Sequence, residues 1–361
     1  MKKEKIAVIS RYPPHKCGIG IYTSSYVEAF RKNNCDIKVI AFEGYDYKDK
    51  NVFGILKNSS LASYIRAARY IKKINPDKIL IEHEYMLYNP VFFPFMLFLL
   101  RAKGFKINVT MHTIPEYKNS FVKRCIFKIW NSTFLIFVNN LYVHTKNAKE
   151  KISRMTLFHS EKTTIVEIPV SERKVLQKKI NSKKINLLCQ GFIIEDKSYH
   201  LVIESFGSHR GYNVKIAGSV QEGSMQKQFD YMKRLKNMAE KHDNIEIIDK
   251  YISEKEKDSM MKWADFIMLP YSNLEQSANL TTAWSFEKIP VCSDLIPFKE
   301  EIENNKYGVL FRNSNANDML RKVESVKSNK KIIAKIKSNI KKLKFERSFR
   351  KMADKFMKTM L

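Results

Sequence analysis

Residues 185–206 read INLLCQGFIIEDKSYHLVIESF, which is an apolar strand-like run, a turn that begins at Gly191, and an amphipathic helical stretch. The same order recurs downstream, where further apolar runs occupy residues 213–219, 245–252, 265–271 and 289–293. Apolar strands that alternate with helical segments indicate a parallel sheet with helices on both faces. The sequence therefore predicts a doubly wound α/β domain over residues 185–340.

The first half of the chain repeats this alternation. Its strand-like runs lie at residues 5–12, 36–42, 78–84, 106–112, 141–145 and 163–170. Between them lie helical patterns such as SLASYIRAARYIKKI (60–74), with apolar residues three and four positions apart. We expect a second Rossmann-like domain over 1–170, a polar linker at 171–184, and helices without strands from about 315 onward. A length of 361 residues suits two domains with a cleft between them.

The net charge of +28 is distributed unevenly along the chain. Residues 1–170 carry 28 Lys and Arg against 13 Asp and Glu, residues 321–361 carry 15 against 3, and residues 171–320 carry 22 against 21. An anionic partner is expected to meet the first part and the tail. A solvated surface on a lysine-rich protein explains the same charge. A nucleic-acid-binding protein is a further alternative, although no zinc-finger, RNP or KH signature supports it, and no nucleic acid is expected.

Cysteine spacing and hydropathy indicate the cellular compartment of the protein. The five cysteines are scattered, without a C-x-x-C pair or a Cys/His group of zinc-site spacing. The start MKKEKIAVIS has no apolar signal-peptide core. The longest apolar run, residues 91–100, contains Pro94 and is shorter than the roughly 20 residues that a membrane-spanning helix needs. We therefore expect a cytoplasmic protein without structural zinc that does not cross a membrane.

Two glycines follow the first strand of the N-terminal half. Gly18 and Gly20 lie in the stretch YPPHKCGIGIYT (12–23), which leads into a helix. Glycine lets backbone N–H groups approach a phosphate or sugar, and a helix N-terminus adds positive potential. Thr23 stands where a dinucleotide fingerprint requires a third glycine, so this turn is not that motif. Such turns are also common as purely structural features.

Three strand-like runs of this half end at or beside a histidine, namely His83, His112 and His144. A histidine at the carboxyl end of a parallel strand can point into a cleft and donate to a substrate oxygen. Each histidine taken alone fits a structural role as well. Because three occupy equivalent ends, we predict that at least one contacts substrate, and we favour His112.

In the second half, two loops carry residues suited to a phosphorylated ligand. Lys197 lies on the loop that begins at Gly191, where its ammonium group can meet a diphosphate. The stretch PYSNLEQSANL (270–280) joins a buried strand to a helix that begins near Ser277. Amides at that helix start can bind an anion, while Glu275 can accept hydrogen bonds from sugar hydroxyls. Pyrophosphate and sugar would lie side by side.

The run YISEKE (251–256), the segment WADFIMLPYS (263–272), Glu275 and IPV (289–291) together resemble the donor domain of glycosyltransferase family four. The agreement covers most of the chain, because further family motifs occur in the family's order: Tyr-Pro-Pro with Gly-Ile-Gly, His83-Glu84-Tyr85, Met111-His112-Thr113, Gly191 with Lys197, and Ala217-Gly218. The resemblance implies the GT-B fold, with an acceptor-binding N-terminal domain and a C-terminal helix at 341–361 packing back on it.

The resemblance also implies a function, namely retaining transfer of a hexose from a nucleotide-diphospho-sugar to a saccharide or lipid-linked acceptor. No metal or other cofactor is implied, in agreement with the absence of an Asp-x-Asp motif. The resemblance assigns Lys197 and Glu275 to catalysis, and we add His112 because of its place at a strand end. The donor site would comprise Gly18, Gly20, Gly191, Lys197, Gly218, Tyr251, Glu275, Ser277, Ala278, Asn279, Leu280 and Glu287, and the acceptor site His83, Glu84, Tyr85 and His112.

One position departs from the family pattern. Ala283 stands where the family's second glutamate binds the ribose, and Glu287, one helical turn further on, is our hypothesis for its replacement. A sugar-nucleotide epimerase of the same fold remains an alternative, although the 251–291 pattern is transferase-like. The basic and aromatic stretch FVKRCIFKIW (121–130) suits an anionic membrane surface on the inner face, and its apolar residues suit a core equally.

Overall fold

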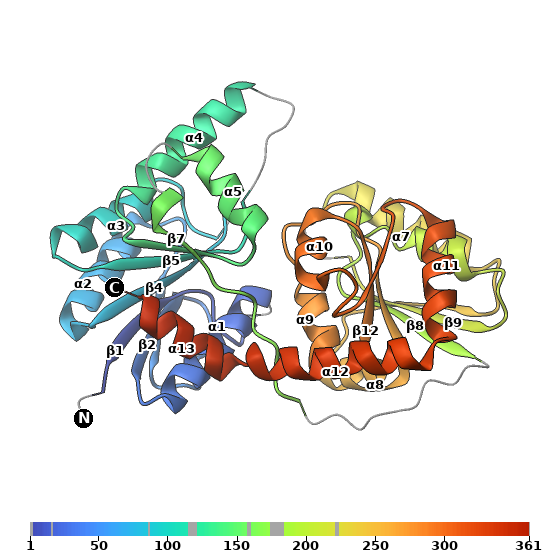
Figure 1. Cartoon of the computed structure of the whole chain (residues 1–361). Helices are drawn as coiled ribbons and strands as arrows, with labels where there is room; N and C mark the ends of the chain where they lie inside the picture. Colours follow the sequence, from blue (N-terminus) through green and yellow to red (C-terminus); the bar gives the residue numbers. More distant parts are fainter. Residues whose placement is uncertain are drawn as a thin grey trace. The chain divides into compact units, whose positions relative to one another are not determined.

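The computed structural model describes residues 3–15, 17–85, 87–114, 121–156, 160–173, 184–220 and 224–360. The chain forms two compact units, shown in Figure 1. Unit 1 comprises Met1–Pro169 together with Phe349–Leu361, and unit 2 comprises Val170–Ser348. Most of the linker expected at 171–184 lies outside the described residues.

Unit 1 contains a parallel sheet of seven strands in the order β3-β2-β1-β4-β5-β6-β7. The order reverses between β1 and β4, which is where parallel α/β sheets bind ligands beyond the carboxyl ends of their strands. The strands are β1 (Lys5–Ile9), β2 (Asp36–Phe42), β3 (Val52–Leu56), β4 (Lys78–His83), β5 (Ile107–Met111), β6 (Asn140–Val143) and β7 (Thr163–Ile165).

Helices cover both faces of this sheet. Alternate β1 side chains enter different cores: Ala7 and Ile9 pack with α2–α5, whereas Ile6 and Val8 pack with α1 and α13. This alternation produces the continuously apolar strands seen in the sequence. The helices are α1 (Gly18–Lys32), α2 (Leu61–Ile74), α3 (Phe92–Ala102), α4 (Phe121–Leu135), α5 (Lys146–Met155) and the C-terminal α13 (Phe349–Thr359).

Unit 2 has a parallel sheet of six strands in the order β10-β9-β8-β11-β12-β13, which reverses between β8 and β11. Its strands are β8 (Ile185–Gln190), β9 (Tyr212–Gly218), β10 (Ile245–Asp249), β11 (Phe266–Leu269), β12 (Ile289–Ser293) and β13 (Val309–Phe311). Its helices are α6 (His200–Phe206), α7 (Gln226–Ala239), α8 (Glu254–Trp263), α9 (Ala278–Ser285), α10 (Ile296–Ile302), α11 (Ala316–Lys327) and α12 (Lys330–Glu346).

The tail differs from the single helix expected at 341–361. Helix α12 ends at Glu346 in unit 2, and α13 begins at Phe349 in unit 1. Between the two helices, Ser348 forms an isolated parallel bridge with Val170, which interrupts helical backbone pairing. Among the described helices, none combines the length and the apolar character that crossing a bilayer requires.

Candidate functional site

The loops after β8 and β9 touch each other through two glycines. Gly191 has a φ of +114°, a conformation that side chains disfavour. A Cβ atom on Gly218 would lie 2.0 Å from the Gly191 carbonyl oxygen, so only glycine fits there. The two loops lie at the carboxyl edge of the unit 2 sheet, beside the point where the strand order reverses.

Lys197 ends a short 3-10 turn (Glu195–Lys197) on the loop after β8. Its Nζ donates a hydrogen bond to the Phe192 carbonyl oxygen at 2.6 Å and lies 6.0 Å from the centre of the Tyr271 ring. Burial lowers the pKa of Lys197 to about 8, because the desolvated ammonium group is disfavoured. A bound anion would offset that desolvation, so the position is suited to a diphosphate.

Helix α9 is tied to the same loop at its first turn. Asn279 donates from its side-chain amide to the Gln190 carbonyl oxygen and to the Tyr271 hydroxyl, each at 2.8 Å. Ser277 caps the helix, since its Oγ accepts from the Leu280 N–H at 3.2 Å. Ala278, the first helical residue, is exposed. The helix start and the lysine loop are therefore held together at one edge of the sheet.

Two further donor-site predictions, Glu275 and Tyr251, lie on loops at the carboxyl edge of the same sheet. Glu275 is half-buried in the loop between β11 and α9. Tyr251 follows β10 and is 55% exposed. Tyr271, which sequence reasoning did not assign, connects Asn279 to the loop, and burial raises the pKa of its hydroxyl to about 12. Its signal in the sequence was a tyrosine hydroxyl two residues after the apolar strand 266–269.

Glu287 does not lie on the α9 helix face, so the expectation that it continues the helix beyond Ala283 is wrong. The helix ends at Ser285, and Glu287 takes a left-handed φ of +54°. Its carboxylate lies 3.2 Å from the Lys344 Nζ of α12, and the two side chains are only 13% and 10% exposed. A role for Glu287 at the ribose remains a prediction.

In unit 1, the predicted acceptor residues lie at and after the end of β4. His83 is 1% exposed, and its ring stacks on Phe134 with centroids 5.2 Å apart. Burial lowers the pKa of His83 to about 3, so its ring is neutral at physiological pH. The half-buried Glu84 accepts a hydrogen bond from the Thr113 hydroxyl at 3.5 Å. The hydroxyl of Tyr85 donates to the Asn131 side chain on α4.

His112 follows β5 and meets a buried carboxylate. Its Nε2 lies 2.8 Å from Glu82 Oε2, and the two side chains are 8% and 1% exposed. The His144 ring lies 5.1 Å away, and burial lowers the pKa of His144 to about 3, with His112 adding to the effect. Sequence reasoning missed Glu82, although a carboxylate inside the apolar strand 78–83 was a usable signal.

The first-turn glycines of α1 are less constrained than those of unit 2. A Cβ atom on Gly18 would meet nothing within 4 Å, and one on Gly20 would make ordinary contacts with backbone atoms. Gly20 donates its N–H to the Cys17 Sγ, which caps the helix. Neither position requires glycine for steric reasons, so close approach of a ligand remains the reason that we expect.

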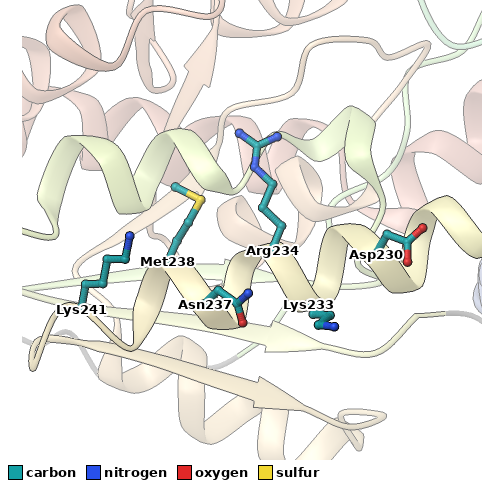
Figure 2. Close-up of a pocket in the computed structure, with 6 residues that line it drawn as sticks. All are labelled: Asp230, Lys233, Arg234, Asn237, Met238 and Lys241. Carbon is teal, nitrogen blue, oxygen red and sulfur yellow. The ribbon is translucent and has the colours of Figure 1, made fainter.

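Two hollows lie beside helix α7. Figure 2 shows one of about 320 Å³ that is lined only by residues in and just after this helix: Asp230, Lys233, Arg234, Asn237, Met238 and Lys241. The second, of about 340 Å³, is lined by Ser219, the residue after Gly218, and by Asp249 at the end of β10. It therefore adjoins the glycine loops. In the described part of the chain, no three His, Cys, Asp or Glu side chains are grouped to hold a metal ion.

Residues 171–343 match the family described as glycosyl transferases group 1. The structure is similar to a glycosyltransferase from Rickettsia africae ESF-5, with a TM-score of 0.78 at 16% identity over 99% of this chain and 98% of that one. It is also similar to sucrose-phosphate synthase from Thermosynechococcus elongatus, with a TM-score of 0.76 at 10% identity over 99% of this chain and 98% of that one. A third similar structure is Anabaena Alr3699/HepE in complex with UDP-glucose, with a TM-score of 0.75 at 13% identity over 98% of this chain and 98% of that one. No curated protein matches the sequence. The predicted GT-B fold is confirmed.

Proposed function

We propose that the chain is a glycosyltransferase, because residues 171–343 match the family described as glycosyl transferases group 1. From this premise we propose that it transfers a hexose from a nucleotide-diphospho-sugar to a hydroxyl of a saccharide or lipid-linked acceptor. The observation that carries the proposal is the half-buried ammonium group of Lys197, held beside the glycine loops and the first turn of α9. The complexes of Anabaena HepE with UDP and UDP-glucose support a nucleotide-sugar donor.

In the proposed reaction, the donor's diphosphate binds between Lys197 and the amides that open α9. The bond between the anomeric carbon and the phosphate oxygen breaks, and the acceptor oxygen bonds to that carbon from the same face. The acceptor's hydroxyl proton passes to the departing phosphate. Positive charge that is already in place favours this step, because the leaving group gains negative charge in the transition state. Glu275 accepts hydrogen bonds from sugar hydroxyls and fixes the ring.

The acceptor is proposed to bind unit 1 at the carboxyl ends of β4 and β5. His112 is the residue that we propose to contact the reacting sugar, oriented by Glu82 through the 2.8 Å contact. The pathway class would be polysaccharide, glycan or glycolipid synthesis, in the cytoplasm or at the inner face of a membrane. We propose no metal or other cofactor, because a fixed lysine ammonium and helix amides supply the charge that a metal ion supplies elsewhere.

The test begins with donor binding. Ligand-observed NMR with uridine, guanosine and adenosine diphospho-sugars identifies the base, and transfer is then assayed with and without EDTA. We expect Glu275→Gln to abolish transfer while the circular dichroism spectrum stays unchanged. Glu240→Gln, an exposed glutamate just after α7, is the matched control and keeps full activity. Wild-type turnover in Glu275→Gln, or no binding of any diphospho-sugar, would refute the proposal.

A further inference from the structure

Helix α4 exposes an apolar stripe. Val122, Ile126 and Ile129 are 64%, 58% and 63% exposed, and Ile136 just beyond the helix is 56% exposed. These positions are four, three and seven residues apart, so they share one face. The opposite face is already buried, with Phe134 at 0% exposure in the core of unit 1. Core packing therefore does not explain the stripe.

Helix α3 continues this surface. Val91, Phe95 and Phe98 are 70%, 39% and 48% exposed, again at helical spacing. The helices are adjacent in Figure 1, and the Trp130 indole N–H of α4 donates to the backbone carbonyl oxygen of Pro90, just before α3, at 3.2 Å. We call the set the α3–α4 patch: Val91, Phe95, Phe98, Val122, Ile126, Ile129 and Ile136. An exposed apolar patch of this kind marks an interaction surface.

The sequence of the segment that carries the patch is strongly basic, and this charge indicates the partner. Residues 91–136 contain seven Lys and Arg (Arg101, Lys103, Lys106, Lys118, Lys123, Arg124 and Lys128) against a single acidic residue, Glu116. A second copy of the chain would bring the same +28 charge and be repelled. An apolar surface in a cationic segment matches a bilayer with anionic headgroups, which attracts lysine and arginine while its interface accepts apolar side chains. We propose that the α3–α4 patch docks unit 1 on an anionic membrane surface.

The patch is joined to the predicted acceptor residues. Helix α3 follows the loop that carries Glu84 and Tyr85, and the Tyr85 ring lies 5.5 Å from Trp130 of α4. Docking would hold these residues close to the lipid headgroups. The acceptor would then be of the lipid-linked class. This assignment of the acceptor rests on the proposed function, whereas the docking of the patch on a membrane does not depend on it.

Vesicle sedimentation tests the docking without any sugar donor. The full chain is mixed with vesicles of phosphatidylcholine alone or of equimolar phosphatidylcholine and phosphatidylglycerol, and we expect binding to the second. Ile126→Ser/Ile129→Ser should lower the partition coefficient about tenfold or more, since two exposed apolar side chains no longer enter the interface. The control Ile332→Ser/Phe345→Ser changes two side chains on α12 that are 41% and 62% exposed and should bind as the wild type does.

Brominated lipids provide a readout that needs no substitution in the patch. They should quench the fluorescence of the bound wild type, and Trp130→Phe should remove that quenching, because the other two tryptophans, the half-buried Trp263 and the buried Trp284, belong to unit 2 and not to the patch. No binding of the wild type, an equal or larger loss in the α12 control, or quenching that survives Trp130→Phe would overturn the proposal. So would a wild-type dimer that Ile126→Ser/Ile129→Ser converts to monomer, because the patch would then join two copies. Donor binding is measured by NMR on the same samples. Donor binding without membrane binding would overturn only the docking proposal, whereas absence of donor binding would count against the proposed function.

Discussion

Replacing Lys197 with methionine should make the protein more stable and much less active. In the folded chain the pKa of Lys197 is lowered from 10.5 to about 8, and each pKa unit corresponds to about 1.4 kcal/mol. Keeping the ammonium charged at pH 7 thus costs on the order of 3 kcal/mol. Loss of the hydrogen bond to the Phe192 carbonyl offsets roughly 1 kcal/mol of the gain. We expect Lys197→Met to raise the free energy of unfolding by about 2 kcal/mol.

The pH dependence of the free energy of unfolding tests whether the charge of Lys197 causes the stabilisation. The pKa of Lys197 is lower in the folded chain than in the unfolded chain. The free-energy cost of keeping its ammonium group charged is therefore fully present below about pH 8 and disappears as the pH rises through 10.5. Urea unfolding of wild type and variant should therefore differ most at pH 7 and converge toward pH 10.5. Lys233→Met, on the exposed face of α7 shown in Figure 2, is the control and should leave stability unchanged.

Activity should change in the opposite direction. Without the ammonium group, kcat/KM should fall roughly 100- to 1,000-fold, the usual effect of losing one group that stabilises developing negative charge. The wild type should lose kcat/KM above about pH 8, as Lys197 releases its proton. A variant that is less stable than the wild type at pH 7, or equally active, would show that the charge and burial of Lys197 do not act as we describe.

Three further substitutions test other parts of the structure. Gly218→Ala places a methyl group against a backbone oxygen and should lower the free energy of unfolding by about 2–4 kcal/mol in urea melts, whereas Gly211→Ala, with open space around it, should not. Glu287→Gln should weaken donor binding in NMR titrations, and unchanged affinity would end the ribose hypothesis. Glu82→Gln should reduce kcat about tenfold or more and shift its pH profile, with an unchanged fold by circular dichroism; a wild-type profile would mean that Glu82 does not orient His112.

The sequence identified the central strands and the edge strands β7 and β10, but it missed the other two edge strands. The runs 36–42 and 289–293 coincide with β2 and β12. The strands β3 and β13 were missed, and both lie at the edges of their sheets. An edge strand pairs on one side only and is less enclosed, so it lacks the continuous apolar run that marks a central strand. Gly54 within β3 weakens the pattern further.

The candidate site could be predicted where chemistry follows a strand end directly. Gly191 and Lys197 stand on the loop after β8, and Asn279 stands in the first turn of α9 after β11; the strand order brings these two segments together, so their proximity follows from topology. The pairing of Glu287 with Lys344 could not be foreseen, because it depends on where α9 ends and on a helix nearly sixty residues later. The contact between Glu82 and His112 likewise depends on side-chain directions across two strands.

The contribution of α13 to unit 1 has a consequence for synthesis on the ribosome. Phe356 packs against Tyr26 and Phe30 of α1, so the last helix covers apolar surface formed by the first. All of Val170–Ser348 is translated before α13 emerges, and during that time the face of α1 has no cover. The nascent N-terminal half is then exposed to aggregation or to chaperone capture until translation nears its end. A stop codon ahead of Phe349 would leave this vulnerable state permanent.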